Sequence, residues 1–272
     1  MSKEFLLTDS EFTHIVDLVY KACGIVLGEH KREMVYSRLA RRIRSLKLSN
    51  FEQYLDYLES NKDEEFSHFI NAITTNLTSF FREMHHFEFL KNTLVPKLLK
   101  ENRSTRRVRI WSAGCSTGEE PYSIAMTVAG MFPIGWDVKI LATDLDSNVL
   151  AKASSGEYSA NSTTGLEPEI LKNWFFKDKQ GENYKVKPEL KKMIHFKRLN
   201  LLQAWPMKGP FDFIFCRNVV IYFDKETKEK LFNNYSNILV SKGHLFLGHS
   251  ESMSKEQKNF NGLGKTMYQK IK

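Results

Sequence analysis

The chain has 272 residues, a formal net charge of +8 and a pI near 9.2, with 42% hydrophobic and 26% charged residues. This balance is typical of a soluble globular protein of one large or two modest domains, and its apolar stretches, no longer than a strand, exclude a transmembrane helix. The N-terminus lacks the apolar core of a signal peptide. Three widely spaced cysteines, Cys23, Cys115 and Cys216, fit neither a disulfide framework nor a metal site and predict a reducing cytoplasm.

Apolar residues at helical spacing predict four short helices, which would form an all-α domain over residues 1–75. We expect Thr8, Asp9 or Ser10 to cap the first helix and Gly24 to end it. The others are expected over about 29–46, from a capping box at Ser49 and Glu52, and over about 62–75.

The second expected helix carries a basic face. On a helical wheel Arg38, Arg41 and Arg44 fall together, opposite an apolar stripe. Such a face is most often simply solvated, but no acidic residue interrupts this helix between Glu33 and Leu48. The face would suit an acidic protein surface, whereas aromatic side chains for stacking nucleic-acid bases are not interleaved with it. We therefore expect no nucleic-acid partner.

A strand, a small-residue loop and a helix follow one another over residues 108–125. The loop, Gly114–Gly118, would let backbone N–H groups approach a ligand at the carboxyl end of the strand. It lacks the Gly-Lys-Ser/Thr ending of a phosphate-binding P-loop. A nucleotide-like ligand is therefore expected here without a phosphate site.

Acidic residues next to this loop narrow the chemical class of the expected ligand. Glu119 and Glu120 stand where the helix begins and would attract an ammonium or sulfonium group. The next strand, about 138–144, ends at Asp144, with Asp146 just beyond, and an acidic residue in this place commonly binds ribose hydroxyls. A ribose partner, a cationic tail and no phosphate site fit S-adenosylmethionine better than NAD or ATP.

The rest of the chain predicts further strands and an insertion. Residues 157–193 interrupt the β-α rhythm with a small antiparallel hairpin, whereas 194–201 and 211–216 return to the sheet. The Asn/Asp-Pro-Pro-Tyr/Phe signature of amino-directed methyltransferases does not follow residue 216, which argues against most N-methylation. His249 and Glu251 are expected to be structural rather than catalytic.

Five motifs, in order, resemble those of the CheR family, methyltransferases that modify chemotaxis receptors. They cover residues 76–83, 111–123, 142–146, 216–224 and 243–251. The resemblance implies a Rossmann-like class I methyltransferase sheet over 108–272 with a small antiparallel subdomain at about 157–193, preceded by the all-α domain and a linker over 76–107. It implies transfer of a methyl group from S-adenosylmethionine to receptor glutamates, giving S-adenosylhomocysteine. The acidic methylation helices of the receptor would contact Arg38, Arg41 and Arg44.

The resemblance also implies which residues form the site. Arg82 and Tyr222 would line the methyl-transfer channel. The residues expected to bind the cofactor are Asn76, Thr78, Arg82, Gly114, Glu119, Asp144, Asn200, Leu201, Arg217 and Asn218. Glu120 and Asp146 remain alternatives to Glu119 and Asp144. In some members of the family the small subdomain binds a receptor tether peptide, which the short hairpin here does not favour.

The expected reaction needs no general base, because a glutamate side chain is already ionised at neutral pH. This agrees with the lack of a His–Asp or Cys–His pair at catalytic spacing. His85 and His86 suggest a metal pair, but we expect no metal, since no third ligand stands at suitable spacing. We further expect a cytoplasmic monomer without membrane insertion. A nucleic-acid methyltransferase and a non-catalytic cofactor-binding regulator are the alternative functions.

Overall fold

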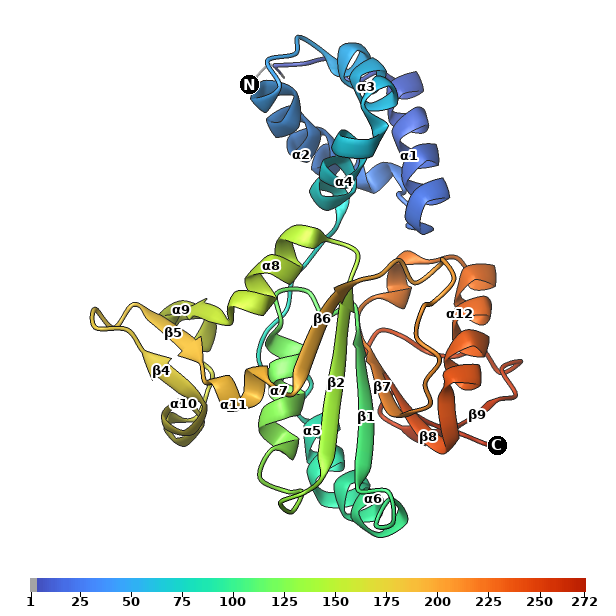
Figure 1. The fold of residues 1–272 in the computed structure, drawn as a ribbon. Coiled ribbons are helices and arrows are strands. Elements are labelled where there is room, and N and C mark those ends of the chain that lie inside the picture. Colours follow the sequence, from blue (N-terminus) through green and yellow to red (C-terminus); the bar gives the residue numbers. More distant parts are fainter. Residues whose placement is uncertain (1–3) are drawn as a thin grey trace. The chain divides into compact units, whose positions relative to one another are not determined.

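The computed structural model describes residues 4–272, which its contacts divide into two units (Figure 1). The helical unit holds the N-terminal residues up to Thr75 together with Tyr222–Thr227, and the sheet unit holds Asn76–Ile221 and Lys228–Lys272. Within residues 4–272, no helix has the length and apolar character needed to cross a membrane.

The helical unit confirms the expected all-α domain. Thr8 caps the first helix in a capping box with Glu11, and Gly24 ends it in a left-handed conformation. The third helix is capped by Asn50 rather than by Ser49, because the Asn50 side chain accepts the N–H of Gln53 at 2.8 Å. The helices are α1 (Asp9–Cys23), η1 (Glu29–Lys31), α2 (Arg32–Ser45), α3 (Phe51–Ser60) and α4 (Lys62–Ile73).

A buried ion pair joins α2 to α4. The Arg42 guanidinium donates to both carboxylate oxygens of Glu65, at 2.7 and 2.5 Å, and Tyr54 donates to the same carboxylate at 3.0 Å. Glu65 is only 1% exposed, so its charge is compensated inside the unit, as a buried carboxylate requires.

The sheet unit is built on one mixed sheet in the order β6-β2-β1-β7-β8-β10-β9. The first five strands in this order run parallel to one another, β10 is antiparallel to β8, and β9 is antiparallel to β10. The bounds are β1 (Arg107–Ala113), β2 (Asp137–Asp144), β6 (Ile194–Arg198), β7 (Phe211–Cys216), β8 (Leu239–Leu247), β9 (Phe260–Gly264) and β10 (Met267–Lys270). The carboxyl ends of β1, β2, β6 and β7 therefore meet at one edge.

Helices cover both faces of this sheet. Neighbouring residues of β1 point to opposite faces: Ile110 belongs to an apolar cluster with Leu98 and Ile124, whereas the Trp111 ring lies 5.3 Å from that of Tyr235. The helices are α5 (His85–Phe89), η2 (Leu90–Leu94), α6 (Val95–Glu101), α7 (Glu119–Val128), α8 (Ser147–Ser155), η3 (Val220–Tyr222) and α12 (Lys225–Ile238).

The segment 76–107, expected to be a linker, belongs to the sheet unit. Phe87, Leu90, Leu94 and Val95 are at most 3% exposed and lie in the apolar cluster that covers the sheet. Apolar residues at helical spacing in this segment pack as helices onto the sheet, so the segment expected to link the two domains also contributes to the core of the sheet unit.

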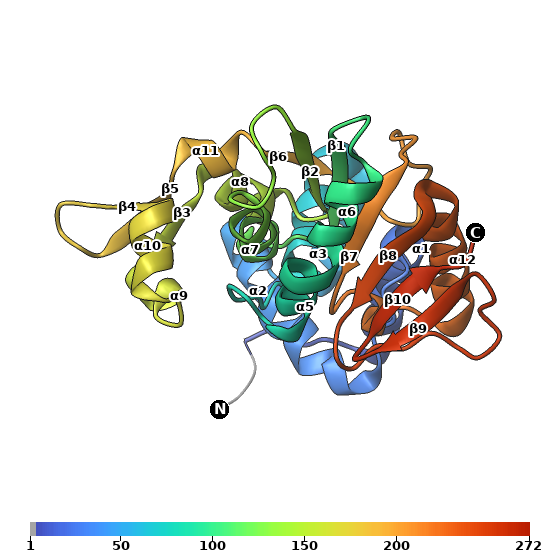
Figure 2. The ribbon, with the colours of Figure 1, turned by 90° about the horizontal axis from the view of Figure 1, so that it is seen from below.

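The expected insertion is a small antiparallel sheet in the order β3-β5-β4, and it lies beyond the β6 edge of the main sheet (Figures 1 and 2). Its hairpin pairs Phe175–Lys177 with Asn183–Val186, as predicted. The elements are β3 (Glu157–Ser159), α9 (Ala160–Thr163), α10 (Pro168–Trp174), β4 (Phe175–Lys177), β5 (Asn183–Val186) and α11 (Pro188–Lys191).

Candidate active site

The glycine loop between β1 and α7 needs glycine at both ends. Gly114 and Gly118 have φ of 84° and 98°, a region that side chains rarely adopt. A Cβ on Gly114 would lie 2.3 Å from Cγ2 of Val219, and one on Gly118 would lie 2.7 Å from the Tyr158 hydroxyl. The loop is therefore packed closely against the segment that follows β7 and against the small subdomain.

Asp144, at the end of β2, holds this loop. One carboxylate oxygen accepts the N–H of Ser116 at 2.8 Å, and the other accepts the N–H of Asp146 at 3.0 Å. Burial raises the pKa of Asp144, although these two N–H groups oppose the effect. The carboxylate thus lies beside the loop, where a ribose partner was expected.

Asp146 and Asn76 form a second layer of contacts around the loop. Asp146 caps α8 through the N–H of Asn148 at 2.8 Å, and its other oxygen accepts from the Asn76 side chain at 2.8 Å. The carbonyl oxygen of Asn76 in turn accepts from the Ser116 hydroxyl. The structure therefore brings Asn76 to the loop, as expected, and gives Asp146 two structural contacts.

The two glutamates at the start of α7 differ in surroundings. Glu119 is 5% exposed and accepts from the Thr117 hydroxyl at 2.6 Å. Glu120 accepts from Ser112 at 2.7 Å and lies 3.6 Å from the Arg217 guanidinium. Burial raises the pKa of Glu120, against the charge of Arg217. Glu119 is thus bonded within the loop, while Glu120 belongs to a separate charge cluster.

The segment that follows β6 lies beside the carboxyl end of β2. The N–H of Leu199 donates to the carbonyl oxygen of Asp144 at 2.9 Å, which brings Asn200 and Leu201 next to the expected ribose site. Asn200 is half-buried and Leu201 is buried. The structure therefore places these two predicted residues close to Asp144.

Arg217 and Asn218, which follow β7, have different contacts. The Arg217 side chain is 2% exposed and contacts Glu83, Glu120 and the carbonyl oxygen of Arg82. Asn218 is half-buried, with φ of 58°, and its N–H donates to Glu251 at 2.8 Å. The Arg217 guanidinium thus has three intramolecular contacts, and the expected binding of the cofactor by Arg217 and Asn218 stays a prediction.

Glu251 holds the segment that follows β7. Its carboxylate accepts three backbone N–H groups, from Asn218 at 2.8 Å, Ile221 at 3.1 Å and Gly248 at 2.5 Å. The side chain is 4% exposed, which agrees with the structural role expected of it. That it anchors a predicted site residue was not foreseen, because the two lie 33 residues apart.

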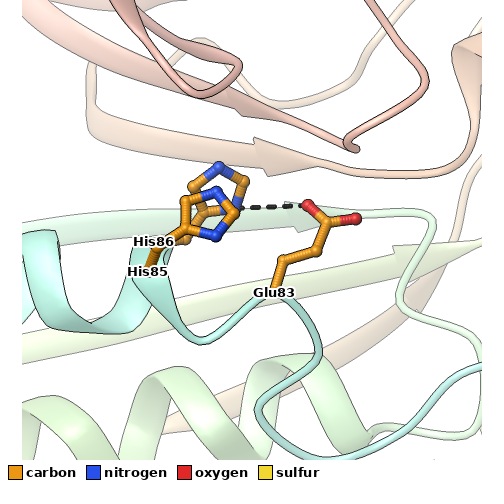
Figure 3. A group of neighbouring side chains, drawn as sticks. All are labelled: Glu83, His85 and His86. Atoms are coloured by element: carbon orange, nitrogen blue, oxygen red, sulfur yellow. Dashed lines mark ion pairs between the residues drawn. The ribbon is translucent and has the colours of Figure 1, made fainter.

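Glu83 lies close to the two neighbouring histidines, His85 and His86. Glu83, His85 and His86 each offer a ligand atom within 4.8 Å of the others (Figure 3). The statement that no third ligand stands at suitable spacing is thus wrong, since the turn at Glu83, with φ of 58°, brings its carboxylate back. A cation here would face the Arg217 guanidinium, 3.5 Å from that carboxylate, so the absence of a metal stays a prediction.

The structure also contains a histidine–glutamate pair, a type that the expectation on His–Asp and Cys–His pairs did not cover. Nδ1 of His249 lies 2.9 Å from Glu83, and the backbone N–H of His249 donates to the same oxygen at 3.1 Å. The pair joins the end of β8 to the segment before α5. It was missed because its members are 166 residues apart.

The remaining predicted residues lie in both units. In the sheet unit Thr78 and Arg82 are half-buried, and Arg82 donates to the carbonyl oxygen of Leu77 at 3.0 Å. Tyr222 falls in the helical unit, where its carbonyl oxygen accepts the N–H of Val26 at 2.8 Å. Its catalytic role stays a prediction.

The three predicted receptor-binding arginines are not equivalent. The Arg38 guanidinium donates to carbonyl oxygens at the end of α4, including that of Ile73 at 2.6 Å. Arg44 is exposed and pairs with Glu4 at 3.0 Å. Arg41 is exposed and, among residues 4–272, has no hydrogen-bond or ion-pair partner. Arg41 and Arg44 are thus more accessible than Arg38.

A mainly parallel sheet with helices on both faces, a glycine loop at its carboxyl edge and acidic residues around that loop define a nucleotide-type site suited to S-adenosylmethionine. The comparisons with known proteins agree. A family model described as the SAM binding domain of CheR methyltransferase matches residues 76–269, and one described as its all-alpha domain matches residues 10–74. The protein is an S-adenosylmethionine-dependent methyltransferase.

Curated relatives match along nearly the whole chain. A probable chemotaxis protein methyltransferase of Rhizobium etli is 45% identical over 261 residues, which cover 92% of this chain and 96% of that one. Chemotaxis protein methyltransferases of Salmonella typhimurium and Escherichia coli are 44% identical over 275 residues, covering 98% of this chain and 92% or 93% of theirs. This chain belongs to the CheR methyltransferase family. The predicted family, fold class and cofactor are confirmed.

Proposed function

We propose that this enzyme transfers a methyl group from S-adenosylmethionine to glutamate side chains of chemoreceptors, forming glutamate methyl esters. The observation that carries the proposal is 44% identity to curated chemotaxis protein methyltransferases over 98% of the chain, across both the helical and the sheet unit. The reaction serves chemotactic adaptation. Receptor proteins that carry clustered glutamates on their cytoplasmic helices are the substrate class.

The residues around the glycine loop fit the cofactor. S-adenosylmethionine supplies a methyl group bound to a sulfonium, together with a ribose and an ammonium group. We assign the ribose hydroxyls to Asp144, which lies at the end of β2 beside the loop, and the ammonium group to Glu119. The family resemblance assigns the adenine side to Asn200, Leu201, Arg217 and Asn218. It assigns further cofactor contacts to Asn76, Thr78 and Arg82, with Arg82 near the methyl group.

The chemistry needs alignment more than proton transfer. A carboxylate nucleophile has a reference pKa of about 4.3, so it is ionised without a general base. The enzyme must hold the oxygen, methyl carbon and sulfur in line and exclude water. Arg82 and Tyr222 are proposed to line the channel in which this alignment occurs. The His249–Glu83 pair is not required as a base.

The basic face of α2 is the proposed receptor contact. The face consists of Arg38, Arg41 and Arg44. Arg41 and Arg44 are exposed, and although Arg44 pairs with Glu4, their positive charge suits the acidic methylation helices of a receptor. We further propose a cytoplasmic monomer that binds no nucleic acid. The three cysteines of the chain are free and buried, as a reducing compartment allows.

The test is methyl transfer to a chemoreceptor cytoplasmic fragment, with RNA and DNA as parallel substrates. The proposal expects label from S-adenosylmethionine in the fragment and none in a variant whose methylatable glutamates are alanines. Label in nucleic acid instead, with binding that weakens steeply as salt is raised, would support the nucleic-acid alternative.

A further inference from the structure

A buried arginine contacts the backbone of Arg82. The Arg217 guanidinium donates a hydrogen bond to the carbonyl oxygen of Arg82. It lies 5.6 Å from the ring centre of Phe87 and 5.8 Å from that of Phe215, and the side chain is 2% exposed. A guanidinium enclosed in this way has little freedom, so the carbonyl that it contacts is held in place.

Glu83 compensates the charge of Arg217 and holds the next residue of the same segment. Its carboxylate lies 3.5 Å from Arg217 and accepts from both the backbone and the ring of His249. Burial alone would raise the pKa of Glu83, but the hydrogen bonds from His249 and the charge of Arg217 outweigh it and lower the pKa. The carboxylate is therefore held ionised.

The C-terminal hairpin fixes the other end of this segment. Nε2 of His85 and of His86 lie 3.3 and 2.9 Å from the carbonyl oxygen of Lys265, at the turn between β9 and β10. The segment Arg82–His86 is thus held from three places, namely the ends of β7 and β8 and this hairpin.

We propose that Arg217 and Glu83 are positioning residues, which fix the backbone at Arg82 so that its guanidinium is aligned for methyl transfer. The inference rests on the proposed function, in which Arg82 lines the methyl-transfer channel. The expectation that Arg217 binds the cofactor stays a prediction, which the Kd for S-adenosylmethionine of an Arg217 variant tests. Because the reaction is accelerated by alignment, a small displacement of the Arg82 guanidinium lowers the rate of the chemical step more than it weakens cofactor binding.

The variants Glu83→Gln and Arg217→Lys test this role. Glu83→Gln keeps the size of the side chain and removes its charge, while Arg217→Lys keeps the charge and removes the planar guanidinium. We expect kcat for receptor methylation to fall about 10- to 100-fold in both, with the Kd for S-adenosylmethionine within about 3-fold of the parent. Glu101→Gln, in an exposed pair with Lys97, is the matched control and leaves both constants unchanged.

A double-mutant cycle shows whether the effect passes through Arg82. If Glu83 acts by positioning Arg82, then Glu83→Gln has little further effect on kcat in an Arg82→Ala background. Fully additive effects in the cycle would overturn the proposal. So would a rise in the Kd for S-adenosylmethionine with unchanged kcat, which would make Arg217 a cofactor ligand after all.

Hydrogen exchange gives a readout that does not depend on methyl transfer. In the Glu83→Gln enzyme, we expect amides of residues 81–87 to exchange at least about 10-fold faster, while those of β1 and β2 stay protected. Unchanged exchange over 81–87 would contradict the proposal even if the protein methylated no receptor. Failure of the parent enzyme to methylate receptors, with faster exchange in the variant, would instead refute the proposed function alone.

Discussion

Nη1 of Arg38 lies 2.6 Å from the carbonyl oxygen of Ile73, so an arginine of α2 closes the C-terminal end of α4. The last carbonyl groups of a helix have no partner within the helix, and a cationic side chain there is favoured by the helix dipole. A residue that the sequence assigned to receptor binding therefore also stabilises the helical unit.

Replacing Arg38 with alanine should reduce stability. The carbonyl groups of Ile73 and Thr74 would lose a charged donor, and hydrogen bonds of this kind contribute on the order of 1–3 kcal/mol. We expect the free energy of unfolding in urea to fall by about 2 kcal/mol in Arg38→Ala. Arg41→Ala is the control and should leave it unchanged. Equal stability of the two variants would show that the Arg38 contacts contribute nothing.

The exposed arginines of α2 should contribute to receptor binding and not to cofactor binding. In Arg41→Ala/Arg44→Ala, we expect the KM for a receptor fragment to rise several-fold, because electrostatic complementarity to its acidic helices is lost. The Kd for S-adenosylmethionine, measured by calorimetry, should not change. A weaker Kd would contradict the division of labour between the two units.

Acid should destabilise the protein through two buried histidines. Burial lowers the pKa of His86 and of His244 to about 4, from 6.5. The native state then binds fewer protons than the unfolded state between these values, so stability is full above pH 6.5 and falls as pH decreases towards 4. Each histidine lowers the free energy of unfolding by about 2 kcal/mol as the pH falls from 7 to 5.

His244→Gln isolates one of these contributions. We expect its loss of stability between pH 7 and pH 5 to be smaller than that of the parent by about 2 kcal/mol, measured by urea unfolding at both values. The comparison is between variants because Asp144 and Glu120, whose pKa burial raises, act in the opposite direction. His68→Gln, at an exposed position, is the control; an identical pH dependence in all three proteins would contradict the prediction.

Gly114 should be intolerant of a side chain. A Cβ would lie 2.3 Å from Cγ2 of Val219, at a φ of 84°. Gly114→Ala should therefore raise the Kd for S-adenosylmethionine at least about 10-fold by displacing the loop, and Val219→Ala should restore part of the affinity because it removes the clashing methyl group. Gly165→Ala, where a Cβ meets no atom within 4 Å, is the control. Normal binding by Gly114→Ala would mean that the cofactor does not use this loop.

Replacing Asp144 and replacing Asp146 should affect different properties, namely cofactor affinity and protein stability. Asp146→Asn is expected mainly to lower stability, because its carboxylate caps α8 and accepts from Asn76. Asp144→Asn should raise the Kd for S-adenosylmethionine more than Asp146→Asn does, since Asp144 is the proposed ribose ligand. The reverse order of the two Kd values, determined by calorimetry, would assign the ribose to Asp146.

The elements with local signals could be predicted from the sequence. The helix bounded by Thr8 and Gly24 was predicted from its capping residues, and the glycine loop from its position between a strand and a helix. Tertiary contacts carried no such signal. Asn218 meets Glu251 because β7 and β8 are neighbouring parallel strands whose ends converge, and Glu83 meets His249 because the segment before α5 packs against the end of β8. These pairs become visible only once the fold is known.

The chemical nature of the product tests the central claim most directly. Receptor fragment labelled by this enzyme from methyl-labelled S-adenosylmethionine would be treated with alkali, and the volatile label would be collected. A glutamate methyl ester releases its label as methanol, which is the result predicted here. Label that stays on the protein through alkali would mean methylation of nitrogen and would contradict the proposed function.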